Sequence, residues 1–222
     1  MSWFSRFAPP PAPEWQAYQE HFKSSFGQKT PLREVRFVVL DLETTGLDVK
    51  KDRMLSLGAM VVEGQEIRIA ERLEYFIHQP QYEPNQSVNI HGIMPQQNAS
   101  GITEEMAIKH LLSFLKQSVI VGHHIGFDIA ILNQATKRIY GKSLQNKVID
   151  TRVLAERVQG LRLGENPREV FTLDQVCHTF NIRLHERHTA AGDTLLTALL
   201  FLKLMGRLQK RGVNTLGQLR RS

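Results

Sequence analysis

The sequence predicts an α/β domain, a mixed sheet flanked by helices. Three observations support this fold class. Runs of β-branched residues come first along the chain, helical patterns then alternate with further strands, and 41% hydrophobic with 23% charged residues is the composition of an ordinary folded domain. At 222 residues the chain is long enough for one domain with short extensions.

The strands are predicted from short apolar runs bounded by turn residues. Glu63–Gln65 separates the second run from the third and suits a hairpin, so the sheet is expected to open as an antiparallel meander. The fourth run is apolar throughout, as a covered central strand would be. Five strands are expected, at residues 36–41, 54–62, 66–77, 119–122 and 148–150.

Helices are predicted from caps and from apolar residues at helical spacing. Thr103 caps a helix whose first turn carries two glutamates, and Thr172 with Gln175 forms a capping box. The expected helices lie at residues 103–118, 128–140, 172–180 and 190–209. In the last helix the residues expected to face the core are Leu195, Leu196, Leu199, Leu202 and Met205.

Composition divides the chain into three parts. Residues 1–30 are interpreted as a proline-rich and aromatic N-terminal extension, residues 31–206 as the folded domain, and residues 207–222 as a basic C-terminal tail. Consecutive prolines near the N-terminus favour a stiff polyproline II spacer. The aromatic residues of the extension either pack back on the domain or anchor a partner protein: Trp15, Tyr18, Phe22 and Phe26.

Charge and cysteine content narrow the classes of function. The net charge of +6 favours a polyanionic partner, such as nucleic acid or an anionic membrane surface. Cys177 is the single cysteine, which excludes an internal disulfide and a cysteine-built zinc site. The sequence shows neither a secretory signal nor an apolar stretch of the ~20 residues that span a bilayer, so a cytoplasmic location is expected.

Two carboxylates at the end of the first strand are the first candidates for chemistry. Asp41 and Glu43 are two residues apart and therefore point to the same side of the strand, while Leu42 points to the other. They lie at the carboxyl end of a strand, where open α/β sheets bind their ligands. Taken alone, these acidic residues are also explained by a solvated strand end.

Two further motifs supply carboxylates from distant parts of the chain. Asp128 opens a predicted helix after an apolar strand and a glycine-containing turn, although the helix dipole alone would favour an aspartate there. His188 and Asp193 are five residues apart, so they converge only if His188 lies on a loop and Asp193 near the helix start. The small residues 190–192 between them permit a close approach of the helix to the sheet.

Four carboxylates gathered at one site repel each other unless cations neutralise them. Oxygen ligands of this type suit Mg²⁺ or Mn²⁺ rather than zinc. Two such ions about 3.5–4 Å apart stabilise both the entering and the leaving oxygen of a phosphoryl displacement. A histidine with a pKa near ~6.5 accepts a proton from water at neutral pH, which makes His188 a candidate general base.

The order of these motifs resembles that of the DEDDh, or DnaQ-like, 3′-to-5′ exonucleases. The motifs are Asp-x-Glu-Thr-Thr-Gly from Asp41, His-x-x-x-Phe-Asp ending at Asp128, and His-x-x-x-x-Asp ending at Asp193. The family includes the proofreading epsilon subunit of bacterial DNA polymerase III, and the resemblance spans residues 36–205. It implies an RNase H-like mixed five-stranded sheet flanked by helices, and a metal-dependent enzyme that releases nucleoside monophosphates from the 3′ ends of nucleic acid, DNA being favoured.

The resemblance also implies roles for individual residues. His188 would be the general base, and two Mg²⁺ or Mn²⁺ ions would be held by Asp41, Glu43, Asp128 and Asp193. The residues near the 3′-terminal nucleotide would be Thr44, Thr45, Gly46, Leu47, His91 and His123. The chain departs from the family pattern at His124, where members often have asparagine, and at residues 94–96, where many have a threonine and an acidic residue.

Three rival interpretations come from other classes of function. The nine histidines invite a zinc site, but no His-Glu-x-x-His or cysteine pattern supports one. A non-catalytic subunit that binds a polymerase and nucleic acid is a second interpretation, although no expected acidic position is missing. An exoribonuclease of the same fold is a third, because the sequence does not decide between DNA and RNA. The expected partners are a free, single-stranded 3′ end and a polymerase or other protein bound through the N-terminal extension, without a membrane.

Overall fold

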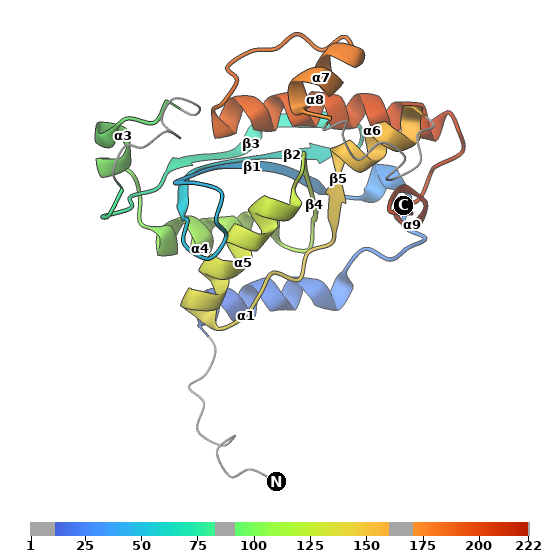
Figure 1. Cartoon of the computed structure of the whole chain (residues 1–222). Helices are drawn as coiled ribbons and strands as arrows, with labels where there is room; N and C mark the ends of the chain where they lie inside the picture. Colours follow the sequence, from blue (N-terminus) through green and yellow to red (C-terminus); the bar gives the residue numbers. More distant parts are fainter. Residues whose placement is uncertain (1–11, 83–91, 160–170, 222) are drawn as a thin grey trace.

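A five-stranded mixed sheet forms the centre of the molecule. The structure is a computed structural model that describes residues 12–82, 92–159 and 171–221. Helices lie on both faces of the sheet (Figure 1), as predicted for this fold class. The strands lie in the order β3 (Glu66–Phe76), β2 (Met54–Glu63), β1 (Phe37–Thr44), β4 (Val119–Gly122) and β5 (Val148–Asp150).

The pairing of the strands places β1 in the middle of the sheet. β1 is antiparallel to β2 and parallel to β4, and β5 is parallel to β4. The predicted hairpin is confirmed, because β2 and β3 pair as antiparallel neighbours. The carboxyl ends of β1, β4 and β5 consequently lie along one edge of the sheet, and we call it the carboxyl edge.

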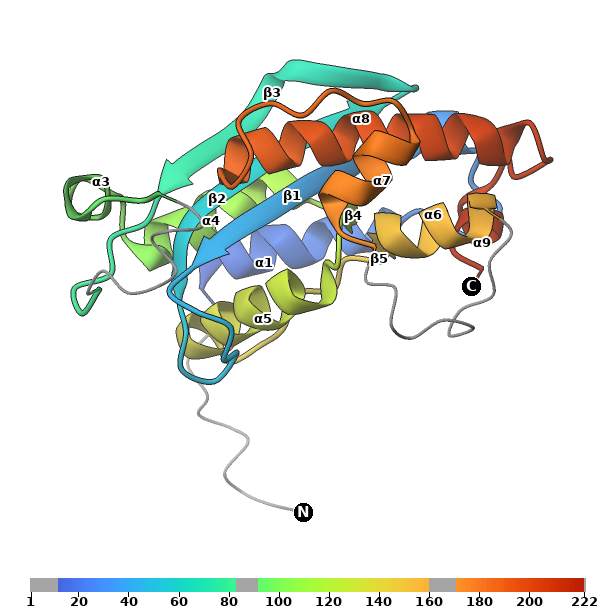
Figure 2. The ribbon, with the colours of Figure 1, turned by 45° about the horizontal axis from the view of Figure 1, so that its top comes forward.

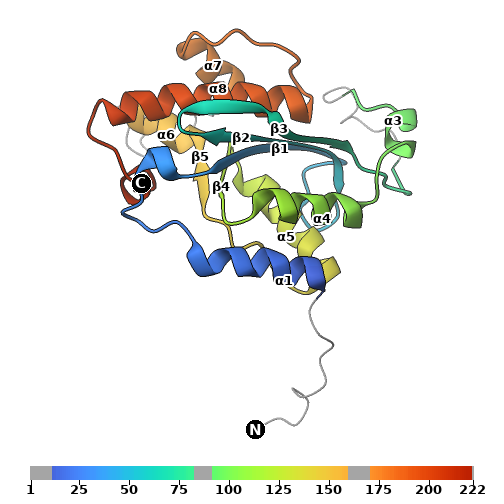
Figure 3. The ribbon, with the colours of Figure 1, turned by 180° about the vertical axis from the view of Figure 1, so that it is seen from behind.

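Two groups of helices cover the two faces (Figures 1 and 3). One face carries α1 (Pro13–Glu20), α4 (Glu104–Leu115) and α5 (Gly126–Tyr140). The other carries α6 (Thr151–Gln159), α7 (Leu173–Thr179) and α8 (Ala190–Gln209). The remaining short helices are α3 (Pro95–Ala99), α9 (Leu216–Leu219) and the 3₁₀ turns η2 (His21–Ser24) and η3 (Leu32–Glu34). Within the described ranges, no helix is both long and apolar enough to cross a membrane.

Alternation along β1 decides which face each of its side chains occupies. Phe37 and Val39 belong to the core under α6 and α8, whereas Val38 and Leu40 belong to the core against α1 and α4. Because side chains alternate with a period of two, the row of Phe37 and Val39 continues into the two acidic residues at the end of the strand. The predicted pair of carboxylates therefore lies on the face that α8 covers.

The core face of α8 differs from the prediction at two positions. Leu195 and Leu199 are 37% and 38% exposed. The buried row instead runs through Leu196, Leu200 and Leu204, which repeat at every fourth residue. Nearly every position from 195 to 205 is apolar, so the sequence alone could not fix the rotation of the helix.

Both terminal segments pack against the domain. Trp15 and Tyr18 of α1 are each 1% exposed, and the Tyr18 hydroxyl donates to Asn146 Oδ1 at 2.6 Å. These two aromatics are therefore part of the core and not free to anchor a partner, whereas the N-terminal prolines 9–11 lie outside the described residues. At the other end, Leu216 and Leu219 are buried, and the Leu216 amide donates to the carbonyl of Thr30 at 2.9 Å.

Helix α8 lies over the sheet (Figure 2), and a glycine lets it approach closely. Gly58 of β2 is paired with Asp41 of β1, so the two residues share one face of the sheet. A Cβ atom on Gly58 would lie 2.2 Å from the carbonyl oxygen of Ala190, the first residue of α8. The missing side chain at Gly58 thus sets the distance between the start of α8 and the acidic end of β1.

Replacing Gly58 by alanine should lower the free energy of unfolding by about 1–3 kcal/mol, the usual cost of overpacking. Urea denaturation measures the change. Gly206→Ala in α8 is the control, because nothing lies within 4 Å of a Cβ there. This control should be neutral or stabilising by up to ~1 kcal/mol. A Gly58→Ala protein as stable as the parent would contradict the close contact.

Candidate active site

The carboxylates predicted from the separate motifs converge at the carboxyl edge. Side-chain oxygens of Asp41, Glu43 and Asp193 all lie within 4.8 Å of one another. Asp41 and Glu43 come from the end of β1, and Asp193 comes from the first turn of α8. The sequence-predicted convergence of β1 with the final motif is therefore present in the structure.

Asp128 approaches β1 from the opposite layer of helices and lies outside the group of three carboxylates within 4.8 Å of one another. It lies in the first turn of α5, is 8% exposed, and its Oδ1 atom accepts a hydrogen bond from the Leu42 amide at 3.0 Å. That bond attaches α5 to β1 between Asp41 and Glu43. Asp128 also acts electrostatically on Asp41, so all four predicted carboxylates share one electrostatic environment.

Burial and mutual repulsion make this cluster costly in its charged form. Burial raises the pKa of Asp41 well above its ordinary value, and the carboxylates of Asp128, Asp193 and Glu43 raise it further. Burial, with the Asp193 carboxylate, raises the pKa of Glu43 to about 7. Burial raises the pKa of Asp128 to about 7, although hydrogen bonds from backbone amides stabilise its charged form and lower the pKa. Such a cluster attracts cations or protons.

Arg187 partly compensates this charge, and the sequence analysis did not single it out. Its guanidinium forms ion pairs with Asp193 and with Asp174 of α7. Arg187 lowers the pKa of both Asp41 and Glu43. The sequence carried no signal for this role, since the contact depends on how α7 packs beside the start of α8.

His188 lies on the loop before α8, as its spacing from Asp193 required. Its side chain is exposed, and its backbone amide donates to Asp193 Oδ2 at 3.3 Å. Its φ of 64° is uncommon for a residue with a side chain. The loop is tightly wound, because a Cβ on Gly192 would lie 2.1 Å from the carbonyl oxygen of Glu186. The backbone of His188 is therefore held beside Asp193, while its side chain is exposed to solvent.

The turn after β1 is organised by a residue that the sequence analysis did not identify. Asp52 accepts hydrogen bonds from the Thr45 hydroxyl at 2.7 Å and from the Asp48 amide at 2.7 Å. A Cβ on Gly46 would meet Asp52 Oδ2 at 2.7 Å, which explains the glycine. Thr44 Oγ1 donates to the Gly46 carbonyl at 2.8 Å. Leu47, at the tip, is 86% exposed.

The histidines of the second motif serve the fold. His123 Nε2 donates to the carbonyl of Phe171 at 2.7 Å, and Nδ1 lies 2.9 Å from the Thr151 hydroxyl. Burial lowers the pKa of His123 to about 4, so the ring is neutral. With both ring nitrogens engaged, this geometry does not support the predicted contact of His123 with substrate. His124 has a φ of 53°, a conformation in which asparagine is enriched, as at this position in many family members.

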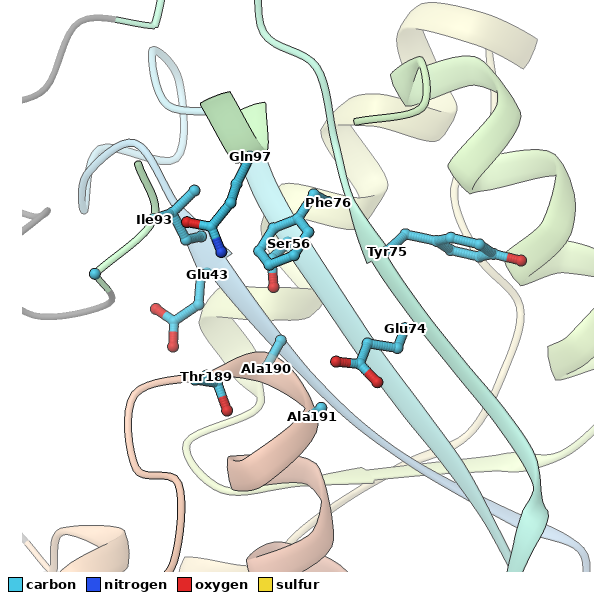
Figure 4. A pocket seen from close by; sticks show the side chains of 11 residues that line it. Glu43, Ser56, Glu74, Tyr75, Phe76, Ile93, Gln97, Thr189, Ala190 and Ala191 are labelled. Atoms are coloured by element: carbon cyan, nitrogen blue, oxygen red, sulfur yellow. The ribbon is translucent and has the colours of Figure 1, made fainter. Parts of the chain in front are cut away.

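A pocket of about 290 Å³ opens beside the carboxylates (Figure 4). Glu43 lies at one end of it, and Ser56 and Phe76 of the neighbouring strands form its floor. Ile93 and Gln97 close the side opposite the start of α8. The predicted substrate residue His91 lies outside the described residues, while the next two residues of its motif, 92 and 93, line this pocket.

The donor set fits hard divalent cations. Every converging ligand is a carboxylate oxygen, which suits Mg²⁺ or Mn²⁺ better than softer metals. Among the described residues, the one group of at least three metal-binding side chains is Asp41, Glu43 and Asp193, without a histidine or cysteine. The alternative zinc site therefore has no support in the described part of the chain.

The geometry defines an exonuclease of the DnaQ-like class, and comparison with known proteins agrees. Residues 38–201 match the RNase T exonuclease family, and the chain belongs to this family. The RNase H-like fold and the enzyme class predicted from the sequence, a 3′-to-5′ exonuclease resembling the DNA polymerase III epsilon subunit, are thereby confirmed.

Several curated relatives are replication proteins. The DNA polymerase III subunit epsilon of Aquifex aeolicus is 30% identical over 185 residues, which are 83% of this chain and 87% of that protein. A PolC-type DNA polymerase III of Thermotoga maritima is 30% identical over 196 residues, 88% of this chain. An epsilon-like protein of Rhodobacter capsulatus is 32% identical over 193 residues, 85% of this chain. This chain spans only 13% and 26% of the latter two proteins.

Solved structures show the same fold. Exonuclease I of E. coli in complex with a dT13 oligonucleotide aligns with a TM-score of 0.66 and 23% sequence identity. The alignment covers 81% of this chain and 43% of exonuclease I. A zinc-bound exonuclease I complex with single-stranded DNA aligns equally well, with a TM-score of 0.66 and 23% identity over 80% of this chain and 42% of that one.

Asp41→Asn should stabilise the metal-free protein at high pH. The folded-state pKa values of Asp41, Glu43 and Asp128 are raised, so the folded state binds more protons than the unfolded state between about pH 4 and 7, and stability falls as pH rises through that window. We expect the free energy of unfolding of Asp41→Asn to exceed that of the parent by about 1–2 kcal/mol at pH 8 in EDTA. The difference should be smaller at pH 5.

Urea denaturation at both pH values measures this difference. The lowered pKa of His123 acts in the opposite direction but equally in both proteins, so it cancels in the comparison. Glu34→Gln, at an exposed position, is the control, and its stability should change with pH as that of the parent does. An Asp41→Asn protein less stable than the parent at pH 8 would show that Asp41 has a structural role.

Proposed function

We propose that this chain removes nucleotides one at a time from the 3′ end of single-stranded DNA and releases nucleoside monophosphates. The observation that carries the proposal is the cluster of Asp41, Glu43 and Asp193 at the mouth of a nucleotide-sized pocket. A carboxylate cluster beside a closed-ended pocket favours attack on the last phosphodiester over attack within a strand.

The pocket is proposed to hold the 3′-terminal nucleotide. Phe76 and Ile93 offer apolar surface to the base, and Gln97 and Ser56 offer hydrogen-bonding groups. Exposed Leu47 would cover the base from the turn after β1, with Thr44, Thr45 and Gly46 beside the 3′-hydroxyl. Asp52 holds that turn in place, so these contacts are largely formed before substrate binds.

Asp41, Glu43, Asp128 and Asp193 are proposed to hold two Mg²⁺ or Mn²⁺ ions. Bound there, the ions supply positive charge for the entering and leaving oxygens of a phosphoryl displacement. Cations also relieve the repulsion that raises the pKa values of Asp41, Glu43 and Asp128. Arg187 competes for the Asp193 carboxylate, and its guanidinium would give up that contact when a cation binds.

His188 is proposed to take the proton of the attacking water. The side chain of His188 is exposed, and its backbone amide is hydrogen-bonded to Asp193 of the cluster. Histidine is the side chain that most often serves as a general base in enzymes. Attachment to α8 keeps the base near the carboxylates, while the loop leaves its ring free to turn toward substrate.

DNA is favoured over RNA by the relatives. The proteins named above are DNA polymerase III proteins, or an exonuclease in complex with a DNA oligonucleotide, and a polymerase partner for this chain is proposed on the same ground. A purely DNA-binding role is less well supported, because Asp41, Glu43 and Asp193 converge and Asp128 is hydrogen-bonded to β1 beside them. Partner binding through Trp15 and Tyr18 is not proposed, since both are buried.

Purified protein with Mg²⁺ or Mn²⁺ should shorten 5′-labelled single-stranded DNA from its 3′ end and release mononucleotides. The measurement compares matched single-stranded DNA, single-stranded RNA and a 3′-mismatched duplex by gel electrophoresis. A 3′-blocked strand and EDTA should each stop the reaction. Predominant internal cleavage, or a rate unaffected by chelation, would reject the mechanism, and faster digestion of RNA would reassign the substrate.

His188→Ala should lower kcat by about 10²–10⁴-fold, the usual effect of removing a general base. Its metal binding should be unchanged, because the side chain contributes no oxygen ligand. Calorimetric titration with Mn²⁺ measures that binding separately from the rate. The control is His185→Ala, an exposed histidine on the same loop, which should retain the parent rate. Equal rates for the two variants would remove His188 from the mechanism.

A further inference from the structure

A second pocket, of about 340 Å³, opens at the β5 end of the carboxyl edge. We call it the β5 pocket. Ile149, Val153 and Leu219 give it apolar walls, and Arg220 and Arg221 line its rim. Both arginines are exposed, and no described residue forms a hydrogen bond or ion pair with either guanidinium.

The register of the sheet aligns this pocket with the carboxylate cluster. Along the carboxyl edge, Phe76 of β3 pairs with Ser56 of β2, which pairs with Glu43 of β1, and these three residues line the first pocket. On the other side of β1, Gly122 of β4 pairs with Asp150 of β5, which lines the β5 pocket. The cluster therefore lies between the two pockets on one edge.

The separation between the cluster and the β5 pocket is short. β1 and β5 are two strands apart, which corresponds to about 10 Å at the usual strand spacing. Gly126 lines the pocket and is two residues from Asp128. The Asp150 carboxylate acts electrostatically on Asp128 as well. A strand that ends in the first pocket and crosses the cluster would reach the β5 pocket within a few nucleotides.

The charges of the β5 pocket suit a phosphate backbone. Two guanidinium groups face one acid, Asp150, whose Oδ1 already accepts from the His124 amide at 3.1 Å and from the Arg152 amide at 2.8 Å. Arginines pair with the phosphates of single-stranded nucleic acids and make cation–π contacts with their bases, and the aliphatic walls offer apolar contact to a base. An acidic peptide could bind the same charges. The position of the β5 pocket beside the carboxylate cluster, however, favours a nucleic-acid strand as the occupant.

We propose that the β5 pocket binds the nucleic-acid strand upstream of its 3′-terminal nucleotide, with Arg220 and Arg221 contacting phosphates. This inference rests on the proposed exonuclease function. It makes the C-terminal residues part of the substrate path, and it predicts that they matter for long strands and not for a single nucleotide.

The test is the double charge reversal Arg220→Glu with Arg221→Glu. We expect kcat/KM on a 20-residue oligothymidylate to fall about tenfold or more, while hydrolysis of the p-nitrophenyl ester of thymidine 5′-monophosphate is unchanged. The Kd of a fluorescent, 3′-blocked oligothymidylate should rise about tenfold, and the salt dependence of log Kd should weaken by about 1.4, since each phosphate contact on a single strand contributes ~0.7.

The matched control reverses two exposed lysines that do not line the β5 pocket, Lys109 of α4 and Lys137 of α5. This control changes the net charge equally and should bind and cleave the oligonucleotide nearly as the parent does. Folding of the Arg220/Arg221 variant should be preserved, because Arg157 holds this end of the chain through the carbonyls of Gln218, Leu219 and Arg221.

Equal loss of oligonucleotide binding in the control would overturn the proposal. Unchanged binding in the Arg220/Arg221 variant would overturn it too, and would leave an acidic peptide as the better occupant. Loss of hydrolysis of the small ester would also overturn it, since that indicates damage to the carboxylate cluster. If the parent cleaves neither substrate, the proposed function fails, but binding of the 3′-blocked strand still decides whether the β5 pocket takes nucleic acid.

Discussion

The close contact between α8 and the sheet is the constraint on which the site depends. Gly58 lies beside Asp41 in the sheet, and its missing side chain leaves room for the carbonyl of Ala190. That contact brings the first turn of α8, with Asp193, to the acidic end of β1. Backbone geometry at one position thus joins two motifs that are about 150 residues apart in the sequence.

Bringing these carboxylates together works against folding, and the protein offsets the cost locally. Amide donors stabilise Asp128, and the Arg187 guanidinium stabilises Asp193. Neither removes the repulsion, since the pKa values of Asp41 and Glu43 remain raised. A site that is unfavourable without cations has a strong affinity for them, because cation binding relieves a penalty already present in the fold. The proposed chemistry uses this residual charge.

The two pockets and the carboxylates form one line along the carboxyl edge. The hairpin β2–β3 supplies the floor of the first pocket, the central strand supplies the acids, and β5 with the C-terminal residues supplies the second pocket. In the proposed function, the antiparallel neighbours of β1 would bind the end of the substrate, and the parallel neighbours would bind the strand that precedes it. Because the sheet is mixed, the two sides of β1 along this edge differ: the first pocket lies on the antiparallel side and the β5 pocket on the parallel side.

The sequence by itself determined the five strands, the main helices, the family and the four acidic residues, because alternation, caps and motif spacing are local properties of the chain. It could not set the rotation of α8, where apolar residues occupy nearly every position and Leu195 with Leu199 proved exposed. Nor could it reveal Arg187, Asp52 or the burial of Trp15, whose roles depend on contacts between segments distant in sequence. Only the tertiary structure decided these, since packing and not periodicity selects which long-range neighbours meet.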